Sequence, residues 1–288
     1  MKLSVIVTTF NKPRDLERVL WGYAVQTAPG AQVVVADDGS GPETAEVVAR
    51  MRERTGLALL HVWHPDQGFR KSEIVNRAIA ASSGDYLLFT DGDTIPRADL
   101  VEVHRRLARP GRFLAGGYLK LPAQTSDAIT VDDVRAGRMA RLGWLRAHGW
   151  RPGHRALRLV GGRRVGALFD LLTPTRPLFA GNNTSVWRTD VYAVNGFDME
   201  MGYGGQDRSV GYRLETAGVR GMQVRHRAVA VHLHHERPYR DAAGVAQNRA
   251  VMDAMRRAGE TRARRGLAEL EPDPSVRIDG APSAQETR

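Results

Sequence analysis

The first 110 residues alternate short apolar runs with stretches of helical periodicity, and this alternation restricts the possible folds more than any other feature. The apolar runs are expected strands and lie at 3–9, 32–36, 57–63 and 85–89. Helical patterns separate them, at 11–20, 42–54 and 71–82. Strands joined through helices pair in parallel, and helices then cover both faces of the sheet. The pattern predicts an α/β fold with a mostly parallel central sheet flanked by helices.

The pattern changes after about residue 112. An expected strand at 113–121 is followed by an arginine-rich stretch interrupted by glycines. Regular patterns return at 178, with an expected helix at 206–217, a strand at 224–233 and a helix at 239–257. Pro, Ser, Gly and Asp are frequent from about residue 271, which is typical of disorder. We therefore expect two halves of one domain at 1–121 and 178–258, an Arg-rich insertion at 122–177, and a largely disordered tail at 259–288.

Positive charge is concentrated in one part of the insertion. The chain has 42 Lys and Arg against 32 Asp and Glu, which gives a formal net charge of +10. Nine arginines and no carboxylate lie between Arg135 and Arg164, so the rest of the chain is almost neutral. A strongly basic chain is typical of nucleic-acid binding. A single basic segment in a nearly neutral chain argues against that class.

Three interpretations of this basic segment stay open. It is a solvated insertion, a helix lying on an anionic membrane, or a site for a phosphate-bearing acceptor. Met139, Leu142 and Leu145 have helical spacing among the arginines, which suits the membrane interpretation. No apolar run reaches the roughly 18 residues of a spanning helix, and cysteine is absent. We expect a cytoplasmic protein, either free or at the inner face of the membrane.

Two of the expected strands end in acidic clusters. Asp91 and Asp93 flank a glycine after the strand at 85–89, and such a pair suits Mg²⁺ or Mn²⁺ bound to a diphosphate. Asp37 and Asp38 follow the strand at 32–36, where a carboxylate pair suits a nucleobase and ribose hydroxyls. Asp and Gly also form ordinary turns. Ligands of parallel sheets bind beyond the carboxyl ends of the strands, so both clusters are candidate sites.

Three segments of the first half together resemble family 2 glycosyltransferases. They are Val5–Asn11, Val35–Ser40 and Gly84–Asp93, in this order and spacing. The resemblance implies a GT-A fold, in which a DxD motif holds a divalent metal and a sugar nucleotide. Gly196–Leu214 in the second half is similar to the catalytic segment of β1,4-galactosyltransferases and related N-acetylgalactosaminyltransferases. The resemblance does not extend to residues 122–177.

The resemblance implies a role for each residue that matches a family motif. Asp38 reads the uracil ring, and Arg70 lies near the diphosphate. Asp91 contacts the ribose or the sugar, while Asp93 binds the metal. The residues expected to bind the nucleotide sugar are Thr8, Phe10, Asp38, Arg70, Asp91 and Asp93.

A histidine pair completes the implied metal site. His232 and His234 are two residues apart on an expected strand and face the same side. On their own they suit a polar surface, but the resemblance implies that they bind Mn²⁺, or Mg²⁺, together with Asp93. Two imidazoles and a carboxylate favour Mn²⁺. His235 is the alternative ligand if the strand has another register.

The second half carries the implied catalytic residue. Inverting glycosyl transfer needs one carboxylate that takes the acceptor proton, and the resemblance assigns this role to Asp207. Asp207 also suits capping of the helix that starts near it. Tyr203 replaces a tryptophan of the related enzymes, and Gln206 replaces a glutamate. The residues expected to contact acceptor or donor sugars are Gly181, Asn182, Tyr203, Gly204, Gly205 and Gln206.

The sequence thus predicts an inverting, metal-dependent glycosyltransferase that moves a hexose, Gal or GalNAc first, from a UDP-sugar to a glycan or lipid-linked glycan. Its partners are the nucleotide sugar, the acceptor and an anionic membrane surface, but no nucleic acid. One alternative is a sugar-nucleotide nucleotidyltransferase, although residues 8–13 lack the glycines of a phosphate loop. The other is an Arg-rich nucleic-acid-binding protein.

Overall fold

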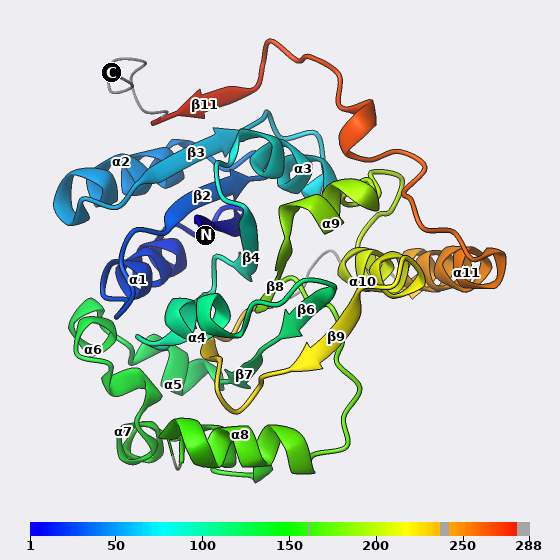
Figure 1. Ribbon diagram of the computed structural model, residues 1–288. Helices are drawn as coiled ribbons and strands as arrows, with labels where there is room; N and C mark the ends of the chain where they lie inside the picture. Colours follow the sequence, from blue (N-terminus) through cyan, green and yellow to red (C-terminus); the bar gives the residue numbers. More distant parts are fainter. Residues whose placement is uncertain (161, 237–241, 281–288) are drawn as a thin grey trace.

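A computed structural model describes residues 1–160, 162–236 and 242–280. Its main sheet has eight strands in the order β11-β3-β2-β1-β4-β8-β6-β9 (Figure 1). The strands of the first half are β1 Leu3–Thr9, β2 Gln32–Asp37, β3 Leu59–Trp63 and β4 Tyr86–Asp91. They pair in parallel, while β8 Thr184–Trp187 pairs antiparallel with β4. The prediction of an α/β fold with a mostly parallel central sheet is confirmed.

The central strands are apolar throughout because both of their faces are buried. Val5 and Val7 of β1 pack into one core, and Ile6 between them packs into another. The same alternation holds on β2, where Val33 and Val35 face the first core and Val34 faces the second. Continuous runs of branched residues are expected for strands that are covered on both sides.

Helices cover the two faces. α1 Pro13–Ala24, α2 Pro42–Thr55 and α4 Leu100–Leu107 contribute to the first core. α3 Lys71–Ala81, α9 Arg188–Ala193 and α10 Gln206–Thr216 contribute to the second core. α11 Ala242–Ala258 lies beside α10 (Figure 1).

The expected strand at 113–121 is split between two sheets. β6 Arg112–Ala115 pairs with β8 and with β9 Arg220–Gln223 in the main sheet. β7 Gly117–Lys120 joins a three-stranded sheet with β10 Val229–His232 and β5 Thr94–Pro96. Within it His232 pairs with Thr94. This pairing brings the end of β10 beside Asp93.

The insertion is folded onto the domain. It contains α5 Ala123–Asp127, α6 Val131–Arg135, η1 Arg138–Ala140, α7 Leu142–Ala147, η2 His154–Leu159 and α8 Gly162–Leu172. Met139, Leu145 and Trp150 are buried in the first core, and Leu142 packs against it. Their helical spacing therefore reflects core packing, and these side chains do not form the membrane-facing surface that the sequence suggested.

Residues 259–280 differ from the disordered tail that composition predicts. The side chain of Asn195 donates to the Ala263 carbonyl and accepts from the Ala268 amide. β11 Arg277–Asp279 then pairs antiparallel with β3 and forms the edge of the main sheet. Its side chains are exposed, so backbone pairing orders this segment without an apolar pattern. Residues 281–288 and 239–241, the latter in the expected helix at 239–257, lie outside the described residues.

Candidate functional site

A cavity of about 1230 Å³ opens at the carboxyl ends of β1, β2 and β4. The opposite wall is formed by the loop before α10 and by α10 and α11 themselves. Of the residues predicted to bind nucleotide, sugar or metal, the cavity is lined by Thr8, Phe10, Asp38, Asp91, Asp93, Gly181, Asn182, Tyr203, Gly204, Gly205, Gln206, Asp207 and His232. The fold thus brings together two groups of residues that lie far apart in the sequence.

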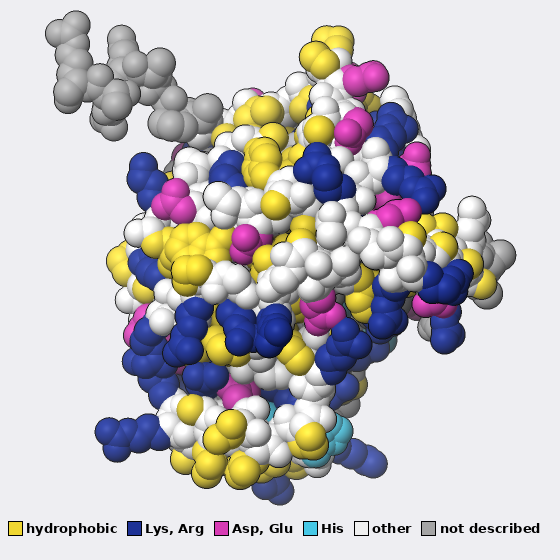
Figure 2. Space-filling view, turned by 45° about the vertical axis from the view of Figure 1, so that its right-hand side comes forward, with side chains coloured by type: hydrophobic (Ala, Val, Ile, Leu, Met, Phe, Trp, Pro, Cys, Tyr) yellow, Lys and Arg dark blue, Asp and Glu magenta, His cyan; other side chains and the backbone are white. Residues whose placement is uncertain are grey.

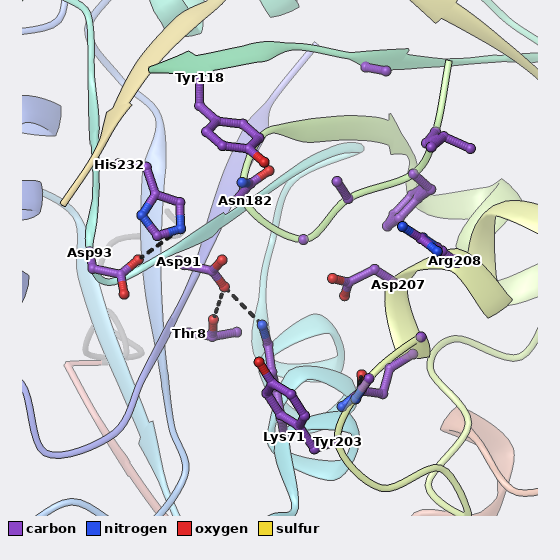
Figure 3. A pocket seen from close by; sticks show the side chains of 18 of the residues that line it. Thr8, Lys71, Asp91, Asp93, Tyr118, Asn182, Tyr203, Asp207, Arg208 and His232 are labelled. Carbon is purple, nitrogen blue, oxygen red and sulfur yellow. Dashed lines mark hydrogen bonds and ion pairs between the residues drawn. The ribbon is translucent and has the colours of Figure 1, made fainter. Parts of the chain in front are cut away.

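Asp91 is held in its ionised form at the centre of the cavity (Figure 3). The Thr8 hydroxyl donates to its Oδ1 at 2.8 Å, and the Lys71 ammonium does so at 2.8 Å. Burial raises the pKa of Asp91, but the Lys71 charge and these hydrogen bonds outweigh it and lower the pKa to about 2. Asp91 therefore stays a hydrogen-bond acceptor at neutral pH.

Asp38 is a buried acceptor at the end of β2. The Arg70 amide donates to its Oδ2 at 3.2 Å, and the His64 ring lies 2.8 Å from its Oδ1. Burial raises the pKa of Asp38, and the contact with His64 opposes this. These two contacts fix the orientation of the Asp38 carboxylate.

The guanidinium of Arg70 is directed away from the cavity. It donates to the Pro65 carbonyl at 2.8 Å and contacts Glu73 at 3.3 Å. Lys71, the next residue, enters the cavity instead and binds Asp91. The cavity is therefore lined by Lys71, which the sequence analysis missed, and not by the predicted Arg70. The signal in the sequence was the adjacent pair of cations at the start of a helix.

Asp93, His232 and His235 form the cluster that suits a metal ion. One ligand atom from each lies within 4.8 Å of the others. His232 Nε2 is 3.9 Å from Asp93 Oδ1, and His235 Nε2 is 3.5 Å from Asp93 Oδ2. Asp93 Oδ1 is buried and has no hydrogen-bond partner among the described residues. An orphaned carboxylate oxygen between two imidazoles fits a divalent transition metal.

His234 differs from its predicted position. Its side chain is exposed, and its amide donates to the Ser126 hydroxyl at 2.8 Å. β10 ends at His232, so the two-residue alternation of a strand does not continue to His234. The turn brings His235 back over His232, and their rings stack with centroids 5.2 Å apart. The alternative that the sequence left open, His235, is the one that faces Asp93.

Lys12 also contacts the acidic cluster. Its ammonium lies 3.0 Å from Asp93 Oδ2, on the same carboxylate that faces the two histidines. With Lys71 on Asp91, both Asp91 and Asp93 have a lysine partner. The chain has only four lysines, and two of them are here. Lys12 was missed in the sequence analysis as well, because nothing in the local sequence links it to Asp93.

Asp207 lies across the cavity from this cluster, in the first turn of α10 (Figure 3). Gly181 donates a backbone hydrogen bond to its carboxylate. Burial and the Asp91 charge raise the pKa of Asp207, while Lys71 opposes this. The N-cap of α10 is Gly205, so the carboxylate of Asp207 is directed to the cavity and not to a capping position.

The loop before α10 is held by contacts from inside the domain. Gly204 and Gly205 have φ of +98° and +99°, a left-handed conformation that favours glycine. The buried Asn248 side chain of α11 donates to the carbonyls of this loop, at 202–204. Gln206 Oε1 accepts from the Gly204 amide at 2.9 Å. Asn248 was also missed in the sequence analysis.

Residues 4–116 match the model described as glycosyl transferase family 2. This stretch holds β1 to β4, both acidic strand ends and the first side of the cavity. The resemblance of the first half to that family is confirmed.

Relatives extend the likeness beyond the family 2 stretch. A validoxylamine A glucosyltransferase of Streptomyces hygroscopicus subsp. limoneus is 30% identical over 250 residues, which are 82% of this chain and 52% of the relative. The chain thus spans about half the length of the validoxylamine A glucosyltransferases that it matches. Asp207, His232 and His235 lie outside residues 4–116, the part of the chain that matches the family model.

Solved structures show the same fold. A mannosyltransferase of Pyrobaculum calidifontis, in complex with GDP-Man and Mn²⁺, has a TM-score of 0.55 at 21% identity, covering 83% of this chain and 58% of that one. TarS residues 1–349 of S. aureus, in complex with UDP-GlcNAc, has a TM-score of 0.58 at 15% identity, covering 88% and 66%. These likenesses confirm the GT-A glycosyltransferase fold.

Proposed function

We propose that this protein is an inverting, divalent-metal-dependent glycosyltransferase that moves a hexose from a UDP-sugar to a glycan or lipid-linked glycan. One observation carries the proposal. A half-buried carboxylate, Asp207, faces the Asp93–His232–His235 cluster across a cavity of about 1230 Å³. In this proposal the donor sugar lies between Asp207, the base, and the metal site.

The donor side offers a partner for each part of a nucleotide sugar. Asp38, with Thr8 and Phe10 beside it, accepts from the uracil ring, and Asp91 accepts from a ribose or sugar hydroxyl. Asp93, His232 and His235 hold the divalent ion, which supplies positive charge to the leaving diphosphate. Lys71 adds a second positive charge on the same side. The P. calidifontis mannosyltransferase binds Mn²⁺ together with GDP-Man, and this supports a metal here.

The acceptor side supplies the base. An acceptor hydroxyl loses its proton to the Asp207 carboxylate as its oxygen forms a bond to C1 of the donor sugar. The bond from C1 to the diphosphate breaks at the same time, and its electron pair leaves with UDP. The raised pKa of Asp207 makes this carboxylate a better proton acceptor than an exposed aspartate.

The donor sugar is proposed from residues 196–214, which resemble galactosyl- and N-acetylgalactosaminyltransferases. Gal and GalNAc are therefore the first candidates. Glucose and GlcNAc come next, because a glucosyltransferase is among the relatives and the TarS structure contains UDP-GlcNAc. The sugar itself contacts Tyr203, Gln206 and the Gly181–Asn182 turn in this proposal.

The test is a donor panel scored for UDP or GDP release. UDP-Gal, UDP-GalNAc, UDP-Glc, UDP-GlcNAc and GDP-Man are each incubated with the protein, with and without Mn²⁺. We expect Mn²⁺-dependent release from one UDP-sugar, and a loss of roughly 10²- to 10⁴-fold in Asp207→Asn. UDP should bind this variant as it binds the wild type. Release that needs no metal, or an unimpaired variant, would contradict the proposal.

A second part of the proposal concerns an anionic membrane surface. No helix among the described residues is long and apolar enough to cross a bilayer. α8, however, exposes Val165, Leu168, Leu171 and Leu172, the last two at 82% and 64%. Figure 2 shows apolar side chains at the lower end of the molecule, where α8 lies, with Lys and Arg at the margins. We propose that this face of α8 rests on anionic lipid.

A further inference from the structure

Acidic and basic side chains both line the cavity, and several arginines gather on one of its sides. The side formed by the ends of β2 and β4 carries Asp38, Asp91 and Asp93, with two lysines as partners. The far side, around β9 and the insertion, carries arginines. Those lining the cavity there are Arg158, Arg176, Arg208 and Arg225. β9 is the last strand of the main sheet, four positions beyond β1.

Arg158 and Arg225 form the centre of this arginine cluster. Arg158, from η2 of the insertion, donates to the Tyr118 carbonyl of β7. Arg225, which follows β9, donates to the Thr175 hydroxyl, and its Nε is buried without a partner among the described residues. Burial and the neighbouring charges of Arg155 and Arg225 lower the pKa of Arg158 to about 10. Both arginines adjoin β7, because Arg158 contacts Tyr118 and a Cβ atom on Gly117 would meet the backbone of Arg225.

The nearby carboxylates are already paired, and among the described residues Arg176 is the one member of the cluster that pairs with them. Both oxygens of Asp170 on α8 are taken, one by His226 at 3.1 Å and the other by Arg227 at 2.7 Å. Glu215 pairs with Arg176. Within the described ranges, no ion pair with a carboxylate is formed by Arg158, Arg208 or Arg225. Arg158 and Arg225 are half-buried, and a group of guanidinium charges in which most members have no counter-ion is a ready anion site.

We propose that this arginine cluster binds an anionic group, a phosphate or a carboxylate, that the acceptor carries. The proposal rests on the proposed function, since it assigns a substrate class to the same cavity. Arg208 adjoins Asp207 in the sequence, so an anion held by the cluster belongs to the molecule that approaches the base. Guanidinium groups suit this task because they bind phosphate and carboxylate through two parallel hydrogen bonds.

The arginine cluster also accounts for part of the insertion. Arg158 and Arg155 belong to the segment of nine arginines, and η2 contacts β7. Tyr118 of β7 receives the guanidinium of Arg155 over its ring at 5.8 Å. The insertion thus contributes a wall of the cavity, and its charge faces the substrate space and not only the solvent.

A binding experiment tests the cluster without requiring turnover. The protein is saturated with UDP and Mn²⁺, so that the donor side is filled, and inorganic phosphate or glucuronate is titrated by calorimetry. We expect saturable binding of at least one anion, weakened tenfold or more in Arg158→Gln/Arg225→Gln. The control, Arg146→Gln/Arg220→Gln, loses the same charge at two exposed sites outside the cavity. Equal binding by both double variants would overturn the proposal.

An acceptor panel then separates the two anion sources. Matched acceptors bearing a phosphate, a carboxylate or a neutral hydroxyl are compared for transfer under the conditions of the donor panel. We expect the anionic form that binds in the titration to be preferred, and the preference to disappear in Arg158→Gln/Arg225→Gln with the KM for the donor unchanged. A donor KM that rises in parallel would assign the arginines to the diphosphate and overturn the proposal. Failure of the proposed function would instead abolish transfer while anion binding persists.

Discussion

At the scale of single residues, the backbone of Gly181 packs closely against the Asp207 carboxylate. A Cβ atom at position 181 would lie 2.8 Å from Asp207 Oδ1, and its three nearest neighbours would all be atoms of this carboxyl group. Any side chain there must displace the base. The glycine is therefore required by a close approach inside the cavity, and this gives a sensitive test of the catalytic assignment.

We expect Gly181→Ala to lower kcat about tenfold or more, because a displacement of the base by a fraction of an ångström disturbs its alignment with the acceptor. The free energy of unfolding should change little, since a carboxylate at a cavity wall moves easily. Gly202→Ala is the control, because nothing lies within 4 Å of its added Cβ. Steady-state kinetics and thermal melts measure both. Full activity of Gly181→Ala would argue against Asp207 as the base.

The metal ligands make a second prediction at this scale. His235 faces Asp93 at 3.5 Å, whereas His234 is exposed. We expect His235→Ala to weaken Mn²⁺ binding roughly tenfold or more, since it removes one of three protein ligands. His234→Ala should bind Mn²⁺ like the wild type. Calorimetric titration with MnCl₂ measures the affinity of both variants. Weaker binding by His234→Ala than by His235→Ala would favour His232 and His234 as the ligands.

Sequence and structure agree at residues whose role depends on local context. Asp38, Asp91 and Asp93 follow apolar runs, so a strand end places them at the ligand edge without further information. Residues fixed by long-range packing were not predictable in this way. Lys12 reaches Asp93 from 81 positions away, and His235 replaces His234 only because β10 ends where it pairs with β5.

At the scale of elements, a buried network joins α4 to the strands beneath it. His104 of α4 contacts the Ser185 hydroxyl of β8 at 2.6 Å and the Asn183 side chain at 2.9 Å. Ser185 in turn donates to Tyr86 of β4 at 2.9 Å. Asn183 also donates to the carbonyl of Gly117. The network ties both sheets together directly behind the Gly181–Asn182 turn.

This network predicts a pH-dependent stability. Burial lowers the pKa of His104 to about 4, opposed by Asn183, whereas the unfolded value is near 6.5. The unfolded chain then binds more protons between these values, so the contribution is complete above pH 6.5 and is lost as the pH falls to about 4. A shift of this size corresponds to about 3 kcal/mol.

Denaturant unfolding of wild type and His104→Gln at several pH values tests this. The difference in free energy of unfolding between them should shrink by about 3 kcal/mol from pH 6.5 to pH 4, because the variant has no imidazole to protonate. The exposed His154→Gln should track the wild type at every pH. A difference that does not change with pH would show that His104 is not buried in neutral form.

The edge strand β11 gives a further prediction at this scale. It pairs with β3, and Arg277 stacks on the Trp63 ring at 5.0 Å. We expect a chain ending at Val276 to lose about 2 kcal/mol of stability, from the lost backbone hydrogen bonds and this contact. A chain ending at Gly280 keeps β11 and should unfold like the full chain. Equal melting temperatures would mean that β11 does not protect the edge of β3.

At the scale of the whole molecule, the charge and the apolar surface meet around α8. Arg163 and Arg164 are exposed on the same helix as Leu168, Leu171 and Leu172. We expect Leu168→Gln/Leu171→Gln/Leu172→Gln to reduce binding to phosphatidylglycerol vesicles roughly tenfold or more, because the apolar contact is lost. The control Val251→Gln/Ile278→Gln removes exposed apolar residues elsewhere. Vesicle cosedimentation measures both, and equal binding would contradict the membrane proposal.

The sequence did predict the overall architecture, because the alternation of strands and helices is repeated and regular. It did not distinguish the two apolar faces of the insertion. Leu142 and Leu145 have the same three-residue spacing as Leu168 and Leu171, but the first pair packs in or against the core and the second is exposed. Periodicity reports only that one face of a helix is apolar. Whether that face meets a core or a membrane depends on the partners that the fold brings to it.

The position of β11 has a consequence for how the chain folds during synthesis. β3 acquires this neighbour from residues made more than 200 positions later. At roughly 5–20 residues per second, a ribosome needs about 10 to 40 s to reach them. For that interval the nascent family 2 half has an open strand edge, which is a template for unwanted pairing. Expression yield should therefore respond to chaperones that bind such edges, even when the finished protein is stable.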